Sequence, residues 1–213
     1  MTVRILVDGK QIEATEGASL LTTCLDNGIF IPNLCHVKGM SHPPASCRLC
    51  FVSVNGAAEP VTACTTPVTG EMAVQTDTPA VRRLQKSALR FLLSVHHVDC
   101  KNCHANKACA LQDLARFLGV GLKSKQLSIY LKEKAIDDHH PCLTHFPNRC
   151  VLCCRCIHVC GERHGMAGFS LAKRGFETMI SFYGMASEAD APCPDCLACA
   201  GICPVGALIP KQE

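Results

Sequence analysis

The sequence of 213 residues contains no tryptophan, few other aromatic residues and no long hydrophobic run. A transmembrane helix needs about 18 consecutive apolar residues, and the apolar stretch 91–95 is bounded by Arg90 and His96. With 5% aromatic residues and a net charge of only +3, the chain lacks the basic and aromatic surface typical of nucleic-acid-binding proteins. We therefore expect neither direct membrane insertion nor nucleic-acid binding.

The sequence motifs of nucleotide-binding and hydrolytic enzymes are also missing. Neither Gly-rich phosphate-binding motif, G-x-G-x-x-G or G-x4-G-K-[ST], occurs in the sequence. No local pattern indicates a Ser-His-Asp triad or a pair of catalytic carboxylates. The first ten residues have the pattern of a strand and a turn rather than of a secretory signal, so we expect a cytoplasmic protein with no active site of its own.

Cysteine, in contrast, is abundant, with 18 residues, and in a cytoplasmic protein this indicates metal ligation rather than disulfides. Two stretches share the spacing C-x2-C-x2-C-x3-C that bacterial ferredoxins use for a pair of [4Fe–4S] clusters, in which the fourth cysteine of each motif binds the other cluster. The predicted ligand sets are Cys150, Cys153, Cys156 and Cys203 for one cluster, and Cys193, Cys196, Cys199 and Cys160 for the other.

Four cysteines nearer the N-terminus predict a [2Fe–2S] site: Cys35, Cys47, Cys50 and Cys64. Their spacing differs from the plant-type C-x4-C-x2-C pattern, although the central C-x2-C pair is kept. The surrounding sequence predicts strands at 2–7 and 11–14, a helix at 19–26, and a second hairpin at 51–56 with an Asn-Gly turn. This order of elements predicts a β-grasp ferredoxin-like domain over residues 1–77.

The best predicted helix, residues 78–95, leads to a site of a different kind. The predicted ligands are His96, Cys100, Cys103 and Cys109, which would offer one imidazole and three thiolates to a [4Fe–4S] cluster. His97 and His104 are competing ligand candidates, and a Cys3His zinc site is the alternative. Together with a short helix at 110–117, this segment predicts a small helical domain over residues 78–118.

Residues 119–148 are predicted to form a connecting segment with a turn or two of helix. Residues 149–213 are predicted to form a bacterial-type two-cluster ferredoxin domain, with a hairpin at 169–182 between its two motifs. Cys24 is expected in the core, and Cys142 and Cys154 belong to no ligand set.

The predicted fold class is therefore α+β, with one [2Fe–2S] and three [4Fe–4S] clusters held by fifteen cysteines and one histidine. So many redox ligands without a substrate pocket predict an electron-transfer protein. A zinc-stapled interaction protein is the alternative from a different functional class.

Several motifs together resemble a known family: Ile31-Pro-Asn-Leu-Cys35, Cys47-Arg-Leu-Cys50, Ala63-Cys-Thr-Thr-Pro67, the His96 and Cys109 frame with Leu111-Gln-Asp-Leu114, the segment 148–156, and Cys203-Pro-Val-Gly-Ala-Leu208. The chain is similar to the iron–sulfur subunit in the diaphorase part of NAD-reducing (bidirectional) hydrogenases. It also resembles the N-terminal regions of the large iron–sulfur subunit of complex I and of iron-only hydrogenases.

The resemblance implies an electron-transfer subunit of an oxidoreductase complex. One partner would be a flavin subunit that carries FMN, a further cluster and the NAD(P)H site, and the other a catalytic redox subunit. A hydrogenase is the first expectation for the catalytic subunit, and a formate dehydrogenase or an electron-bifurcating transhydrogenase is the alternative. The chain departs from the family at Cys154, where such motifs usually carry a residue such as Gly or Thr.

Overall fold

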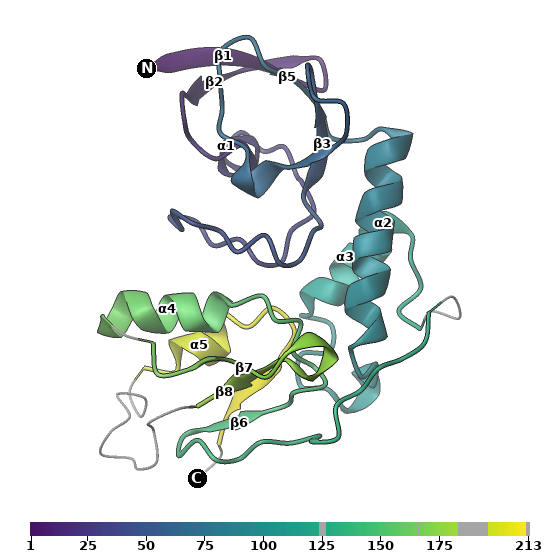
Figure 1. Cartoon of the computed structure of the whole chain (residues 1–213), viewed down its shortest axis with the longest axis vertical. Coiled ribbons are helices and arrows are strands. Elements are labelled where there is room, and N and C mark those ends of the chain that lie inside the picture. The colour runs from purple at the N-terminus through teal and green to yellow at the C-terminus, as the bar shows by residue number, and fades with distance from the viewer. Residues whose placement is uncertain (124–126, 166, 183–195, 212–213) are drawn as a thin grey trace. The chain divides into compact units, whose positions relative to one another are not determined.

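The computed structural model describes residues 1–123, 127–165, 167–182 and 196–211 (Figure 1). It has helices and small sheets and divides into two compact units, one of Met1–Arg90 with Phe117–Val120 and the other of Phe91–Arg116 with Gly121–Glu213. Helix α2 (Pro79–Ser94) begins in the first unit and ends in the second. No helix in the described ranges is long and apolar enough to cross a bilayer.

The first unit is built on a five-stranded sheet with the strand order β2-β1-β5-β3-β4. Strands β1 (Thr2–Val7) and β2 (Lys10–Thr15) form the predicted antiparallel hairpin. Its turn residues Asp8 and Gly9 both have positive φ, which matches the twist of a tight hairpin. Strand β5 (Ala73–Gln75) runs parallel to β1 and antiparallel to β3 (Phe51–Val54), and β4 (Val61–Thr62) pairs with the other edge of β3.

Helix α1 (Leu20–Asp26) packs its apolar side chains into the core of this unit. The hydroxyl of Ser19 accepts a hydrogen bond from the main-chain N–H of Thr22, and Gly28 follows the helix with φ of 73°. These residues provide the expected N-cap and left-handed C-terminal position. Cys24 is fully buried on the inner face of α1, as predicted, and burial raises the pKa of its thiol to about 11, with a smaller contribution from Asp8.

The second hairpin is longer than its Asn-Gly signature predicts. Asn55 and Gly56 form a turn and Gly56 has positive φ, but β3 meets β4 only after residues 55–60. The main-chain N–H of Asn55 donates to the carbonyl of Ala73, and the Asn55 side chain accepts from the N–H of Ala73. Asn55 therefore joins β3 to β5 rather than folding β3 back in a two-residue hairpin.

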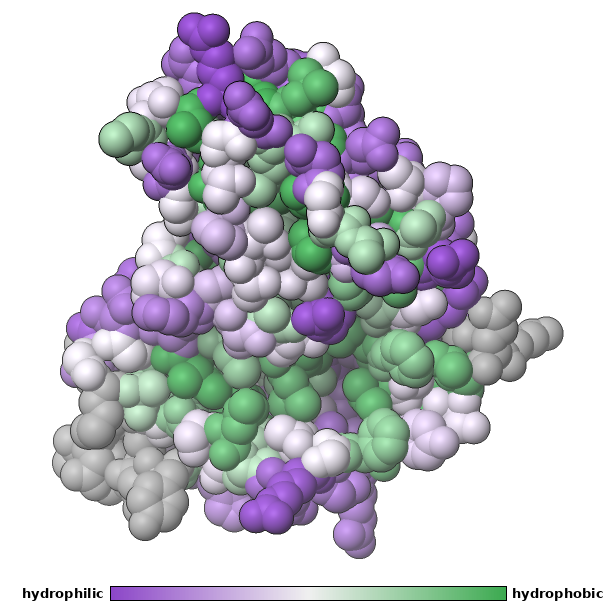
Figure 2. Space-filling model, turned by 45° about the horizontal axis from the view of Figure 1, so that its top comes forward, coloured by the Kyte–Doolittle hydropathy of each residue, from purple (hydrophilic) through white to green (hydrophobic). Residues whose placement is uncertain are grey.

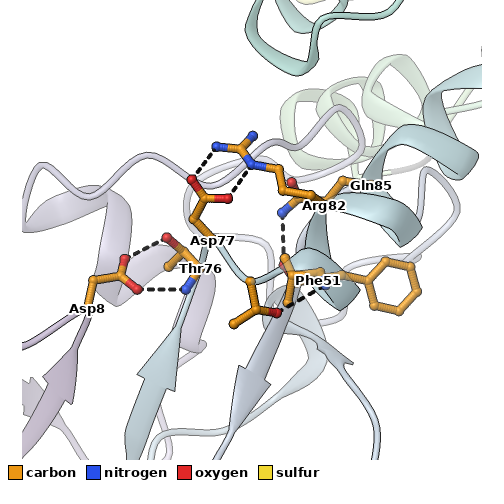
Figure 3. Close-up of polar contacts among 8 residues, drawn as sticks. Asp8, Phe51, Thr76, Asp77, Arg82 and Gln85 are labelled. Carbon is orange, nitrogen blue, oxygen red and sulfur yellow. Dashed lines mark hydrogen bonds and ion pairs between the residues drawn. The ribbon is translucent and has the colours of Figure 1, made fainter.

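Polar contacts attach the start of α2 to the sheet (Figure 3). The hydroxyl of Thr78 caps the helix by accepting from the N–H of Val81 at 3.2 Å. The buried Gln85 side chain donates to the carbonyl oxygen of Phe51 on β3 at 3.0 Å, while Asp77 pairs with Arg82 at the surface. The helix that precedes His96 is thus fixed at its beginning by side chains of the [2Fe–2S] unit.

The second unit contains two small sheets and short helices. Strand β6 (Leu143–His145) pairs antiparallel with β9 (Leu208–Pro210), and β7 (Ser170–Ala172) pairs with β8 (Met179–Ser181). The hairpin predicted at 169–182 is therefore present, with a 3-10 turn, η3 (Gly175–Glu177), in its connection. The described part of 119–148 contains no helix, contrary to expectation, and β6 was not predicted.

Helices α4 (Arg155–His164) and α5 (Ala198–Gly201) carry cysteines of the two motifs and pack together. Their buried cysteines Cys156, Cys160 and Cys199 share a core with Leu143, Phe169, Ile180 and Leu208 from the two sheets. Helix α3 (Ala110–Leu118) follows the cysteines of the histidine-containing segment. In this unit, cysteines replace much of the apolar core that a domain of this size normally has.

Candidate iron–sulfur sites

The four N-terminal cysteines lie close together and are all buried in the loops around β3 and β4. The Sγ atoms of Cys35 and Cys47 are 3.4 Å apart. Cys50 directly precedes β3, and Cys64 lies in the 3-10 helix η1 (Ala63–Thr65) that directly follows β4. The N–H of Ala63 donates to the carbonyl of Cys50 at 2.8 Å, so strand pairing holds this part of the site.

The four thiols form two pairs, each of which shares a proton. A hydrogen bond from Cys47 lowers the pKa of Cys35 to about 5, whereas the same contact raises the pKa of Cys47. Likewise, Cys50 lowers the pKa of Cys64, and the pKa of Cys50 rises. One sulfur of each pair is therefore favoured as a thiolate, the form that binds iron, and two thiolate pairs match the two irons of a [2Fe–2S] cluster.

The loop between Cys35 and Cys50 directs main-chain N–H groups at sulfur. The N–H groups of Ser46 and Cys47 donate to the Cys35 sulfur and help to lower its pKa. Ala45 and Arg48 have positive φ, which reverses the chain direction around these donors. Such a concave arrangement of N–H groups stabilises negative charge.

His96 follows α2 directly, and its ring is oriented by the main chain. Its Nδ1 atom lies 3.0 Å from the carbonyl oxygen of Arg149. Because a carbonyl can only accept, Nδ1 carries the proton and Nε2 keeps a lone pair. Burial lowers the pKa of His96 to about 4, so the ring is neutral near pH 7, which is the form that binds a metal.

The three cysteines after His96 are grouped at the start of α3. Cys100 begins the 3-10 helix η2 (Cys100–Asn102), the N–H of Cys103 donates to its carbonyl, and Cys109 directly precedes α3. Burial raises the pKa of Cys109, and the nearby Cys103 and Cys100 contribute to this shift. The three thiols therefore lie close enough to influence one another electrostatically.

The competing histidines have different surroundings. His97 is exposed, and its main-chain N–H donates to the carbonyl of Asn148. His104 is also exposed, and its ring lies beside Gly206. Neither ring shows the buried, main-chain-oriented geometry of His96.

Four cysteines from both ferredoxin motifs line one cavity: Cys150, Cys153, Cys156 and Cys203. Burial raises the pKa of Cys150 to about 12 and that of Cys153 to about 11, and the Cys203 thiol adds to both shifts. The N–H of Leu152 donates to the Cys150 sulfur at 3.4 Å, and that of Ala207 to the Cys203 sulfur at 3.2 Å. This is the crossed grouping that the spacing predicts, with Cys203 joining the first motif.

The same cavity contains a histidine that the sequence analysis did not single out. His145 of β6 lines it together with the four thiols and with aliphatic side chains. It lies on a strand that only its pairing with β9 reveals, and no ligand-like spacing marks it in the sequence. A buried imidazole is therefore a functional candidate that could be found only in three dimensions.

The last ligand set is described in part, because Cys193 lies outside the described residues. Cys160 and Cys199 are buried in the contact between α4 and α5. Cys196 lies beside the end of α4, where the His164 Nε2 atom is 3.4 Å from its sulfur and an Arg163 N–H is 3.9 Å away. The N–H of Gly168 donates to the Cys160 sulfur at 3.4 Å.

The two motifs repeat a left-handed residue before each helix. Cys154 precedes α4 with φ of 59°, and Leu197, at the equivalent place in the second motif, precedes α5 with φ of 41°. Cys154 also lines the cavity of the first set, where its Sγ lies 3.5 Å from the carbonyl of Leu152. Cys142 lies on the segment beside β9, where its carbonyl accepts from Lys211.

In the part of the chain that the structure describes, no three His, Cys, Asp or Glu side chains converge on a point suited to a single metal ion. A tetrahedral zinc site requires all ligands at about 2.0–2.3 Å from one ion. The ligands of an iron–sulfur cube bind four different irons and therefore stand farther apart. The spread of these thiols is suited to clusters rather than to zinc.

Two family models match the chain. Residues 1–79 match the 2Fe-2S iron-sulfur cluster binding domain, and residues 85–122 match the NADH-ubiquinone oxidoreductase-G iron-sulfur binding region. The first match contains the four buried cysteines of the first unit, and the second contains His96, Cys100, Cys103 and Cys109.

Curated relatives align over almost the whole chain. NADPH-Fe(3+) oxidoreductase subunit alpha of Geobacter sulfurreducens is 32% identical over 98% of this chain and 24% of its own length. NADP-reducing hydrogenase subunit HndD of Solidesulfovibrio fructosivorans is 31% identical over 98% of this chain and 36% of its own length. The chain thus spans only about a quarter to a third of these relatives.

A solved structure matches the fold over nearly its full length. A chain in the crystal structure of NAD+-reducing [NiFe]-hydrogenase in the H2-reduced state aligns with a TM-score of 0.86 and 28% identity, covering 99% of this chain and 88% of that chain. Together with the family matches, this shows that the chain belongs to the family of iron–sulfur modules that form the N-terminal part of the large iron–sulfur subunit of complex I and the diaphorase iron–sulfur subunit of NAD-reducing hydrogenases.

Proposed function

We propose that this chain relays electrons between a flavin subunit that oxidises NAD(P)H and a second catalytic redox subunit, most directly a hydrogenase. A bound iron–sulfur cluster supplies one-electron redox chemistry. The residues of this chain hold the thiolate ligands, direct N–H groups at sulfur and exclude water from the sites. These roles explain why so many buried side chains are cysteines rather than Leu or Phe.

The observation that carries this proposal is the gathering of Cys150, Cys153, Cys156 and Cys203 around one cavity. These residues come from two motifs more than 40 positions apart in the sequence. Packing of α4 against α5 and pairing of β6 with β9 bring them together. Such crossed ligation is a property of two-cluster ferredoxins and serves no purpose in a zinc-stapled protein.

The complete ligand assignment is part of the proposal. It comprises one [2Fe–2S] cluster on Cys35, Cys47, Cys50 and Cys64, and three [4Fe–4S] clusters, on His96, Cys100, Cys103 and Cys109, on Cys150, Cys153, Cys156 and Cys203, and on Cys160, Cys193, Cys196 and Cys199. The mixed sheet with α1 against it supports a β-grasp ferredoxin for the first domain. The α4 and α5 repeat supports a two-cluster ferredoxin for the last.

The surface supports assembly with other subunits. Hydrophobic side chains reach the surface among hydrophilic ones on the face shown in Figure 2. In the second unit, exposed large side chains include Ile129, Tyr130, Leu131, Ile136 and Phe176, and the rings of Tyr130 and Phe176 stack at 4.6 Å. Grouped exposed apolar side chains favour a protein partner, and FMN and NAD(P) would be bound there rather than on this chain.

The same module would serve a formate dehydrogenase or an electron-bifurcating transhydrogenase equally well, because the catalytic partner adds nothing to the ligand sets of this chain. The zinc-stapled alternative requires four ligands around one ion, and the described residues do not provide such a group.

The function is tested with the chain purified anaerobically, free of partners and with its clusters intact. Dithionite should bleach its visible absorption, whereas NADH, NADPH or hydrogen alone should not. Adding the flavin subunit should then permit reduction by NAD(P)H. Turnover of NADH with a dye by the isolated chain, or no reduction after the flavin subunit is added, would contradict the proposal.

A further inference from the structure

His145 is a buried polar side chain without a hydrogen-bond partner for its ring. Its exposed fraction is 0%, and neither Nδ1 nor Nε2 is hydrogen-bonded. Buried polar groups in proteins are nearly always hydrogen-bonded, because an unpaired group loses its interactions with water and gains nothing in return. The ring of His145 therefore calls for a partner that is not a protein atom.

The main chain of His145 is held firmly. Its N–H and carbonyl exchange hydrogen bonds with the main chain of Asp137 at 2.9 and 2.8 Å, and in the β6–β9 ladder it pairs with Leu208. Its ring meets the ring of Phe182 nearly perpendicularly, with a centroid distance of 5.8 Å. Backbone pairing and ring packing thus fix the imidazole at the wall of the cavity.

The other walls of this cavity are thiols and aliphatic side chains. They include Cys150, Cys153, Cys156, Cys203 and Ile180. None of these aliphatic side chains can donate a hydrogen bond, whereas a neutral imidazole always carries one N–H. Four cysteines already provide one ligand for each iron of a cube, so His145 is not needed as a ligand.

We infer that His145 donates a ring N–H to a sulfur atom of the cluster held by these four cysteines and thereby raises the reduction potential of that cluster. The inference depends on the proposed function, because it requires the cluster. A hydrogen bond to cluster or thiolate sulfur withdraws electron density and stabilises the reduced form, which carries one more negative charge. In a buried site, such a bond acts strongly because little water screens it.

A second buried histidine in the same unit provides a matched control. His140 is also fully buried and also contacts Phe182, at 5.0 Å. Its Nδ1 accepts from the N–H of Cys142 at 3.1 Å, and it is not among the residues that line the cavity. Replacing His140 should therefore disturb packing to a similar degree without removing a donor to the cluster.

The test is an EPR-monitored redox titration of the anaerobically purified chain and its His145→Phe, His145→Gln and His140→Phe variants. His145→Phe should lower the midpoint potential of one [4Fe–4S] cluster, His145→Gln should lower it less because the amide can still donate, and His140→Phe should leave all potentials unchanged. Unchanged potentials in His145→Phe, with four clusters present, would overturn the inference. Absence of clusters from the wild-type chain would instead refute the proposed function.

A second measurement applies if His145→Phe does not fold. In a His96→Cys, His164→Ala background labelled with [15N]histidine, His145 is the remaining histidine placed at a proposed cluster. Pulsed EPR of the reduced protein should detect a histidine nitrogen coupled to one cluster signal, and adding His145→Gln should abolish it. No histidine coupling in the labelled background would also overturn the inference.

Discussion

The Nδ1 atom of His96 lies 3.0 Å from the main-chain carbonyl oxygen of Arg149, the residue directly before Cys150. This contact orients the imidazole of one proposed site from the backbone of the next. It fixes the protonated nitrogen and leaves Nε2 available as a ligand, in the arrangement that metal-binding histidines usually show.

The first prediction concerns this ligand. His96→Ala should remove or degrade one [4Fe–4S] signal and leave the other three clusters present. His96→Cys should keep the cluster but lower its reduction potential, because a thiolate brings more negative charge to the iron than an imidazole does. EPR spectra of the reduced variants, with redox titration, measure both effects.

The matched control is His97→Ala, because His97 is exposed and should not alter any cluster. If His97→Ala abolishes the signal while His96→Ala does not, the ligand is the neighbouring histidine. Normal signals and potentials in all three variants would show that neither histidine is a ligand.

The second prediction concerns Gly206, three residues after Cys203. Its φ is +63°, and a Cβ atom added there would lie 2.7 Å from Ala105 Cβ and from His104 Cε1. Gly206→Ala should therefore destabilise the protein by about 1–3 kcal/mol. Gly201→Ala in α5 is the control, since no atom lies within 4 Å of the added Cβ. Equal thermal stability of the two holo variants would contradict the predicted clash.

The third prediction concerns Cys154, which has a left-handed backbone. Cys154→Gly removes the steric cost of this conformation and should stabilise the protein by about 1 kcal/mol without changing its iron content. Cys142→Gly, at a position without positive φ, should give no such gain. Thermal unfolding under anaerobic conditions and iron analysis measure the two effects, and loss of iron in Cys154→Gly would show that Cys154 is a ligand.

The fourth prediction compares two contacts at the base of α2 (Figure 3). Gln85→Leu leaves the carbonyl of Phe51 without its buried donor and should cost about 1–2 kcal/mol. Asp77→Asn breaks an exposed ion pair with Arg82 and should cost less than about 1 kcal/mol. Denaturant titrations of both variants, followed through the visible absorption, give the difference; a larger effect for Asp77→Asn would contradict it.

The Asp77 variant should also depend on pH. Hydrogen bonding from Arg82 lowers the pKa of Asp77 below its ordinary value, so the carboxylate stabilises the folded state above about pH 4. That contribution is lost as the pH falls through the lowered pKa. The difference between wild type and Asp77→Asn should therefore shrink under acid conditions.

Elements with local signals were predictable. Ser19 and Thr78 cap α1 and α2, Asp8 and Gly9 turn the first hairpin, and each of these signals acts within a few residues. The short strand β6 was missed because its three residues have no alternating pattern and its partner, β9, lies about 60 residues later in the sequence. Nothing local indicates such a pairing.

The proposed sites divide in the same way. Cysteine spacing predicted that Cys203 would join Cys150, Cys153 and Cys156, and the structure brings these four together. His145 could not be predicted because its place at this cavity depends on the β6–β9 pairing. The [2Fe–2S] spacing is unusual, and the pairing of Cys35 with Cys47 became visible only from their sulfur positions.

The central claim, a four-cluster electron relay, is tested most directly by the metal content and EPR spectrum of the fully loaded, anaerobically purified chain. We expect about fourteen irons per chain, two for the [2Fe–2S] cluster and four for each of three cubes, with little zinc and with four distinguishable reduced signals. Eight or fewer irons per chain, or stoichiometric zinc in place of iron, would contradict the claim.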